Sequence, residues 1–237
     1  MMFSVFMPNR NNSYVWMNVV FLVGFLLMGK ISPYAIIFGY FLETLIIGVF
    51  NVFKMVAASR NDGSGKTIIF LVLFFMFHYG MFVAIQSLFV FVIVGIDGQT
   101  FIKEPFYIIE NYRGILALEG MTYVLTILIG TQLVKFIFDF MLSQKHLEFT
   151  AYEIMYKPYV RIVIQQFAVI IAFFFFILFV DATLMAALLL ILFKSLIDFG
   201  LSVIREDTKA LDYMVEKLYD GKTPKDELRK QLLLFSE

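Results

Sequence analysis

Residues 188–200 read LLLILFKSLIDFG, a hydrocarbon run interrupted only by Lys194, Ser195 and Asp198. Lys194 and Asp198 are four residues apart, so they share one face of a helix. On a soluble amphipathic helix that face would simply meet water. In lipid, each charge costs about 2.5–3.5 kcal/mol at the centre of a spanning helix, and the pair would then mark a site.

The composition of the whole chain decides between these two environments. Of 237 residues, 61% are hydrophobic and only 16% are charged, whereas soluble domains carry about 25% charged residues. Several apolar runs reach the roughly 20 residues that a helix needs to cross a bilayer. We therefore predict an all-α, polytopic membrane protein. The chain has no cysteine, which excludes disulfides and thiolate chemistry, and its zero net charge argues against a nucleic-acid partner.

Apolar runs and the polar breaks between them predict six transmembrane helices and a short tail. The expected spans are residues 14–28, 34–56, 67–96, 115–140, 158–180 and 182–204. Residues 1–204 then form the transmembrane domain. Residues 205–237 have balanced charge and an amphipathic pattern, which predicts a helical hairpin on the membrane face or on a partner protein. The tail could also support a homo-oligomer.

The distribution of basic residues predicts the orientation in the cell membrane. In a six-span topology, one side holds eight basic residues before the tail: Arg10, Lys54, Arg60, Lys66, Lys135, Lys145, Lys157 and Arg161. The other side holds three: Lys30, Lys103 and Arg113. The positive-inside rule places both termini in the cytoplasm.

A phosphate-loop motif is suggested by GSGKT at residues 63–67, but it fails on inspection. The motif needs a glycine where Arg60 stands, and no strand precedes it. We interpret the segment as a turn between two spans.

Polar residues inside the predicted spans are the strongest functional signal. Glu43 and His78 both lie near mid-depth of their spans, as does Lys194, and Asp198 follows toward the cytoplasm. The predicted ligand-binding or proton-relay residues are Glu43, Asn51, His78, Gln166, Lys194 and Asp198. The predicted supporting residues are Lys54, Tyr79 and Arg161. Most of them fall in the middle or cytoplasmic half, as expected for a polar cavity open to the cytoplasm.

A purely structural interpretation of this set stays open. Buried ion pairs can set helix register, and amides such as Gln132, Gln165 and Gln166 can join helices by hydrogen bonds. Lys54 and Arg161 lie near span ends, where long side chains reach the headgroups.

Four motifs resemble an uncharacterised family of bacterial and archaeal integral membrane proteins, catalogued as a domain of unknown function. They are GYFLETLIIGVFNVFKM, FMFHYGMFVAIQSLFVF, PYVRIVIQQ and LFKSLIDFG. The matching positions are Glu43, Asn51, Lys54, His78, Tyr79, Gly80, Arg161, Lys194 and Asp198. Relatives carry further histidines where this chain has Gln86, Gln166 and Ser202, so a histidine-rich site would be reduced here to His78. The resemblance implies a shared polar centre and no established activity.

Three functions remain open. A transporter or receptor would bind a small solute, or relay a proton, at Glu43, His78, Lys194 and Asp198. A membrane-embedded enzyme would use His78 with Glu43 or Asp198 as a general base, or the three as a minimal metal set completed by water. A structural or accessory subunit would dock through its tail. The sequence identifies no cofactor, and besides the lipid bilayer the expected partner is an unidentified small solute.

Overall fold

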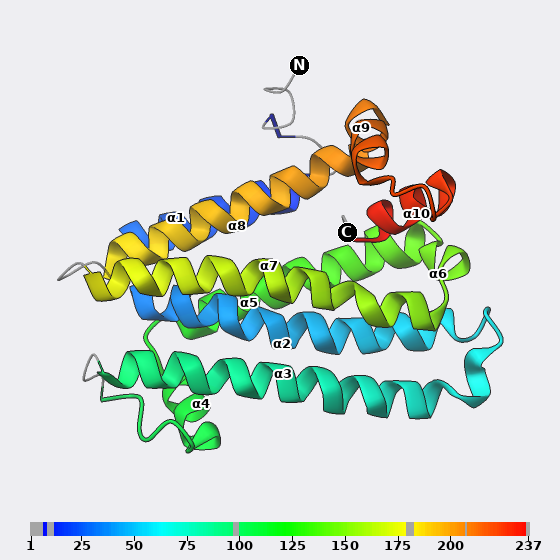
Figure 1. Cartoon of the computed structure of the whole chain (residues 1–237). Coiled ribbons are helices and arrows are strands. Elements are labelled where there is room, and N and C mark those ends of the chain that lie inside the picture. The colour runs from blue at the N-terminus through cyan, green and yellow to red at the C-terminus, as the bar shows by residue number, and fades with distance from the viewer. Residues whose placement is uncertain (1–6, 9–11, 97–99, 179–182, 207, 236–237) are drawn as a thin grey trace.

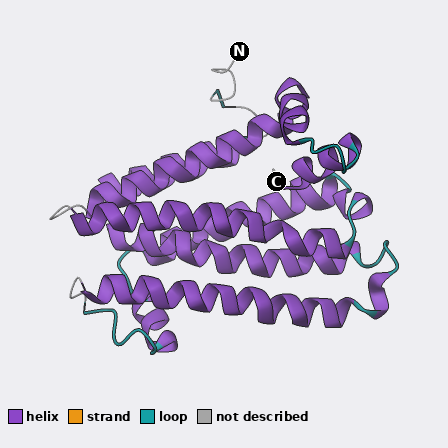
Figure 2. Ribbon diagram, viewed as in Figure 1, coloured by secondary structure: helices purple, strands orange, loops and turns teal. Residues whose placement is uncertain are grey.

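The computed structural model describes residues 7–8, 12–96, 100–178, 183–206 and 208–235, and every regular element in these ranges is helical (Figure 2). The all-α prediction is therefore confirmed. The long helices are α1 (Ser13–Leu27), α2 (Pro33–Ala58), α3 (Ile68–Ile96), α5 (Met121–Val134), α7 (Ala151–Leu178) and α8 (Thr183–Glu206). The shorter ones are η2 (Ser64–Lys66), α4 (Ile108–Leu116), η3 (Lys135–Leu142), α6 (Lys145–Glu148), α9 (Thr208–Leu218) and α10 (Lys225–Phe235).

Within the residues that the structure describes, four stretches of helix are long and apolar enough to cross a membrane. They are Pro33–Ala58, Ile68–Val92, Met121–Leu142 and Ala187–Ile204. A shorter apolar helix covers Val15–Leu27. These helices and the composition indicate a membrane protein.

Two helices do not begin where the predicted spans begin, for local reasons. The fourth span was expected to begin at residue 115, but α4 and α5 are separated by a break at Gly120, whose φ of +78° is left-handed. The fifth was expected to begin at residue 158, but α7 begins at Ala151. Thr150 and Glu153 form a capping box there, in which each residue accepts a hydrogen bond from the other's backbone N–H.

The helix α2 is the centre of the molecule, because it contacts α3, α5, α7 and α8. Figure 1 shows α3 on one side of α2 and α7, and α8 on the other. The helix α1 packs against α5 and α8. Consequently α2 and α7 separate two flanks of the bundle, one formed with α8 and the other with α3.

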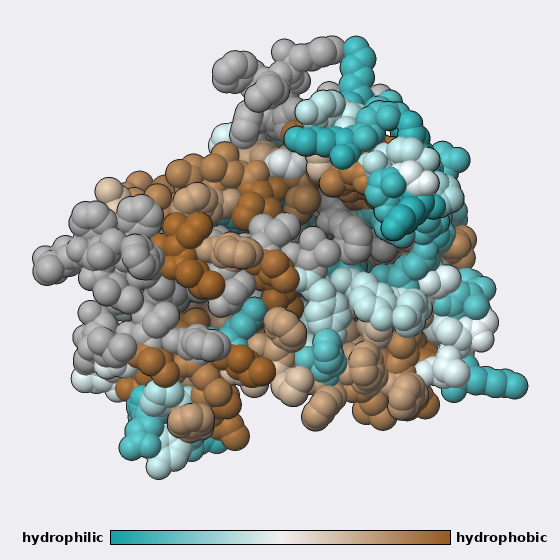
Figure 3. Space-filling model, in the orientation of Figure 1, coloured by the Kyte–Doolittle hydropathy of each residue, from teal (hydrophilic) through white to brown (hydrophobic). Residues whose placement is uncertain are grey.

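The surface divides along the helix axes. On the face drawn in Figure 3, hydrophobic side chains predominate among the coloured ones along the long helices, whereas hydrophilic ones gather mainly around α9 and α10 at one end and over α4 at the other. Asn111 of α4 holds the preceding loop by accepting from the Lys103 backbone N–H at 2.7 Å and donating to the Glu104 carbonyl at 3.0 Å. An apolar band between two polar ends is the surface expected of a protein embedded in a bilayer.

Candidate functional site: a buried charge cluster

Three polar residues reach the same depth in the bundle. The helices α2, α5 and α8 all begin at the end of the molecule that lies away from α9 and α10 (Figure 1). At 1.5 Å per residue, Glu43 lies about 15 Å from the start of α2, and Gln132 and Lys194 lie about 17 Å from the starts of α5 and α8. The hydrocarbon core is about 30 Å thick, so all three are near its middle.

These residues are joined through the Glu43 carboxylate. Lys194 forms an ion pair with Glu43 Oε2, and Gln132 donates to Glu43 Oε1 at 3.4 Å. The Glu43 side chain is 3% exposed and the Lys194 side chain 14%. A buried charge of either sign costs several kcal/mol unless it is paired and hydrogen-bonded, so each group makes the other tolerable in this place.

Two further side chains complete the cluster. The Lys194 ammonium lies 5.0 Å from the centre of the Tyr40 ring, within cation–π range. Buried Asp198 lies one turn from Lys194 on the same helix, and Tyr40 is within electrostatic reach of both Asp198 and Glu43. We call Tyr40, Glu43, Gln132, Lys194 and Asp198 the charge cluster. It holds one more carboxylate than ammonium groups.

Polar groups continue from the charge cluster toward the tail end of the bundle. Ser202 follows Asp198 by one turn on α8 and is fully buried. Lys135 follows Gln132 and is also buried, and it begins η3, which is a π-helix. Such segments occur frequently at functional sites, because the wider turn changes which side chains face inward.

A buried hydrogen bond lies beside the charge cluster on α5. Thr131 donates to the Asn18 side chain of α1 at 2.8 Å, and both residues are buried. This hydrogen bond links α1 to α5 next to Gln132. Amide and hydroxyl side chains commonly form such interhelical hydrogen bonds in membrane proteins.

His78 is at a comparable depth but on the other flank. Its Nδ1 lies 2.8 Å from the Tyr159 hydroxyl of α7, and its ring stacks on Phe74 at 5.5 Å. The expectation that His78 neighbours Glu43 is therefore not met. The physical reason is that α3 packs on the face of α2 that contains Thr44. There the Tyr79 hydroxyl donates to the Thr44 backbone carbonyl at 2.7 Å. Around the axis of α2, this face is about 100° away from Glu43.

The other predicted residues are dispersed. Asn51 is buried, and among the described residues its Nδ2 has no hydrogen-bond partner. The Lys54 ammonium lies 5.4 Å from the Phe140 ring centre, so it stays within the bundle's tail end. Arg161 and Gln166 belong to α7, but their side chains lie outside those that the structure describes.

The minimal metal set is not brought together. In the described ranges, no three His, Asp or Glu side chains lie close enough to hold one ion. Glu43 and Asp198 belong to the charge cluster, whereas His78 belongs to the α3–α7 flank. The donor arrangement therefore does not fit the metal site considered from the sequence.

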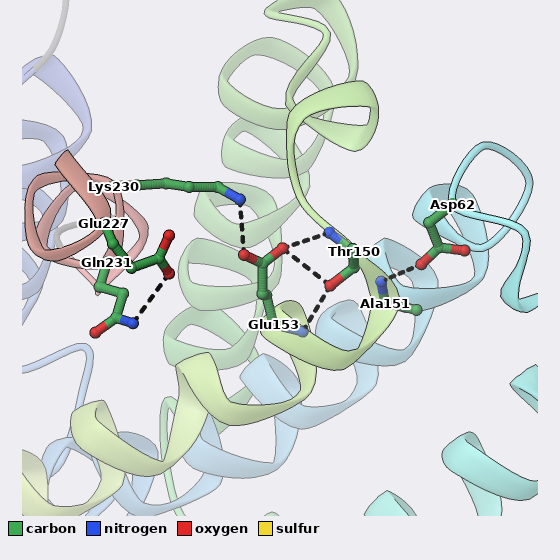
Figure 4. A network of polar contacts seen from close by, with 7 residues as sticks. All are labelled: Asp62, Thr150, Ala151, Glu153, Glu227, Lys230 and Gln231. Carbon is green, nitrogen blue, oxygen red and sulfur yellow. Dashed lines mark hydrogen bonds and ion pairs between the residues drawn. The ribbon is translucent and has the colours of Figure 1, made fainter. Parts of the chain in front are cut away.

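A second polar network ties the tail to α7 (Figure 4). Lys230 of α10 donates to Glu153 at 2.7 Å, and Glu153 also accepts from Thr150. Partial burial raises the pKa of the Glu153 carboxyl, but these hydrogen bonds outweigh it, and the net pKa lies below its ordinary value. Asp62, from the loop after α2, accepts from the Ala151 backbone N–H at 2.6 Å, so two carboxylates stabilise the start of α7.

Tyr40 and Gln132 were not among the predicted site residues. Gln132 was interpreted as a joining amide, and its position one helix away from Glu43 cannot be read from spacing. Tyr40 does carry a signal, because it lies three residues before Glu43 and so near it on one helical face. The capping box at Thr150 and Glu153 is likewise legible in the sequence as TAYE.

Comparison with known proteins gives the chain a family. Neither a curated protein nor a solved structure matches it. A family model described as "Family of unknown function (DUF6498)" matches residues 1–222, which include every helix from α1 to α9. The resemblance to a family of unknown function drawn from the four motifs is therefore confirmed. The chain belongs to the DUF6498 family, a family of unknown function.

Proposed function

We propose that this protein is a small-solute or proton-linked transporter or receptor, with the charge cluster as its site. The observation that carries the proposal is the meeting of Glu43, Lys194 and Asp198 in the middle of the apolar helices. Ionisable groups at this depth are costly, and in membrane proteins they typically mark solute sites and proton relays.

The charge balance supports a proton, a cation or a zwitterion as the species bound. The charge cluster contains two carboxylates and one ammonium group. A carboxylate of the charge cluster can bind a proton or a solute ammonium group, and Lys194 can bind the carboxylate of a zwitterion. Tyr40 and Gln132 supply a hydroxyl and an amide for orientation.

We further propose six spans, counting α1 and α7, with both termini on the cytoplasmic side of the cell membrane. In support, consecutive long helices run in alternate directions, and α9 and α10 lie at the end where the basic residues concentrate (Figure 1). The buried polar groups Asp198, Ser202 and Lys135 then lead from the charge cluster toward the cytoplasm.

The two alternatives have less support. A metal-assisted enzyme would need His78 beside the carboxylates, and His78 instead contacts Tyr159. An accessory subunit accounts for the docked tail, but it gives no reason for an ion pair and a further carboxylate at mid-depth. We therefore place the activity at Glu43 and Lys194.

The experiment is a flux assay on the full chain in proteoliposomes that contain a trapped pH-sensitive dye. A panel of amino acids, amines and organic acids is added outside, with a membrane potential applied by potassium and valinomycin. We expect one class of solute to drive proton movement, and Glu43→Gln to abolish it because it removes one carboxylate of the charge cluster and the ion pair with Lys194.

The matched control is Glu110→Gln, which removes an exposed carboxylate from α4. It should transport at the unmodified rate. Solute uptake by Glu43→Gln at the unmodified rate, or proton movement that no solute in the panel alters, would contradict the proposal.

A further inference from the structure

The flank formed by α3 and α7 carries a polar pair inside the apolar band. His78 lies ten residues after the start of α3, about 15 Å along the helix, and its side chain is half-buried. Tyr159 of α7 is also half-buried, and the two are joined by the 2.8 Å contact between Nδ1 and the hydroxyl oxygen. We call them the His78–Tyr159 dyad.

The dyad has a hydrogen-bond donor left over whichever tautomer is present. If the Tyr159 hydroxyl donates to Nδ1, the Nε2–H of His78 remains. If Nδ1–H donates instead, the Tyr159 O–H remains. Within the described ranges, neither side chain has a second hydrogen-bond partner.

Hydrocarbon offers no acceptor to this donor. An unpaired donor in lipid carries a substantial free-energy cost, and ester carbonyls of phospholipids lie outside the 30 Å core, so they do not reach this depth. The chemistry that satisfies the dyad is a carbonyl on a lipid-soluble molecule that resides in the middle of the bilayer.

Aromatic rings on both sides of His78 favour a flat ligand. Phe74, one turn before, is nearly parallel to the imidazole, with an interplanar angle of 8°, and Phe82, one turn after, has its ring centre 6.2 Å away. Both phenyl side chains are exposed on the surface of α3. A conjugated ring can pack on either of them while its carbonyl faces the dyad.

We propose that the His78–Tyr159 dyad binds a lipid-soluble carbonyl compound of the quinone class, with the ligand's carbonyl oxygen accepting the dyad's free hydrogen. The site is separate from the charge cluster and does not depend on the transport function. No electron transfer is included, only binding.

A second copy of the chain is the competing occupant of this flank. Membrane helices pair through small residues, and on α3 these are Gly80 and Ala84. At 100° per residue they lie about 200–240° from His78, on the opposite flank of the helix. A dimer formed through Gly80 and Ala84 would leave the dyad facing lipid. This arrangement favours a small ligand over a second copy of the chain at the dyad.

The test uses the full chain in lipid nanodiscs and an azido-benzoquinone with a decyl tail as photoreactive probe. After illumination, mass spectrometry locates the label. We expect saturable labelling of peptides around residues 74–82 and 159, competed by decylubiquinone. His78→Phe keeps the ring stacking but removes the donor, and should weaken binding about tenfold, the effect of one lost hydrogen bond in an apolar site.

Two variants keep the test interpretable. His78→Gln restores a donor and should recover most of the labelling, whereas Phe70→Leu, an exposed position two turns away, should leave labelling unchanged. Non-saturable labelling, or equal labelling in His78→Phe, overturns the proposal. Because the chain has no cysteine, Phe77→Cys introduces the sole thiol, and disulfide-linked dimers that exclude the probe would assign this flank to a second copy instead.

Discussion

At the scale of single residues, the charge cluster explains the two charges in LLLILFKSLIDFG. Lys194 is there because it pairs with Glu43, which lies 151 positions earlier in the chain. Asp198 adds a second buried carboxylate one turn from Lys194 on the same helix. The sequence predicts that these residues are buried and polar, since each interrupts an apolar run. It does not predict which helices meet, because that depends on packing between distant spans.

Removal of Lys194 should therefore be more damaging than removal of Glu43. Lys194→Met leaves the Glu43 carboxylate, which is 3% exposed, without its ion-pair partner, and we expect a loss of about 3–5 kcal/mol in the free energy of unfolding. Glu43→Gln keeps an amide oxygen that can accept from the more exposed Lys194, so a loss of about 1–3 kcal/mol is expected. Denaturant unfolding of the purified protein in detergent measures both.

The control for this comparison is Lys225→Met, because Lys225 forms an exposed ion pair with Glu216. Its removal should lower the free energy of unfolding by less than about 0.5 kcal/mol. Equal and small losses for all three variants would mean that the ion pair is not buried in the way described.

At the scale of elements, α2 holds its neighbours closely because glycines face them. A Cβ at Gly48 would lie 2.6 Å from the Tyr79 ring, and one at Gly39 would collide with Val124 of α5. Tyr79 cannot easily move away, since its hydroxyl is bonded to the Thr44 carbonyl. The positions of the helices along the chain could be predicted from apolar runs. This close packing could not, because a glycine inside a span does not show which helix packs against it.

Gly48→Ala should accordingly destabilise the protein by about 1–3 kcal/mol through overpacking against Tyr79. Gly130→Ala is the matched control, because a Cβ there meets nothing within 4 Å and alanine favours a helix more than glycine does. Thermal unfolding of both variants in the same detergent makes the comparison. Equal melting temperatures would show that α2 and α3 are not in this contact.

The contact between α10 and α7 should depend on pH. The folded-state pKa of Glu153 is below its ordinary value of about 4.5, so the contact stabilises the docked tail above that pH. Its contribution is lost as the pH falls through the lowered folded-state pKa. We expect hydrogen exchange of the α10 amides, corrected for intrinsic rates, to accelerate in that acidic range.

Glu153→Gln should already show the faster exchange of α10 at neutral pH and should lose the acidic step, whereas Glu110→Gln on distant α4 should behave as the unmodified protein. An acidic step of the same size in Glu153→Gln would assign it to another group.

At the scale of the whole molecule, the two flanks of α2 and α7 carry different chemistry. The α8 flank holds the charge cluster, and the α3 flank holds the His78–Tyr159 dyad. The sequence placed Glu43 and His78 at one site because both are polar and at mid-depth. The depth of a residue follows from its position along a span. The flank that it faces depends on the order of the helices around the bundle, which cannot be read from a single sequence.

Water and solutes should reach the charge cluster from the side of the molecule where the tail lies. Ser195→Cys, next to Lys194, and Ser202→Cys, on the route toward the tail, place a thiol where a thiolate-specific, membrane-impermeant reagent can report water. Leu192→Cys, exposed on the apolar surface of α8, is the control. The most direct measurement is labelling of these three variants in sealed vesicles of both orientations. Labelling of both serine positions from the tail side alone, with Leu192→Cys unreactive, is the predicted result. Unreactive thiols at both serine positions in folded protein would show a dry, structural ion pair and would contradict the transport proposal.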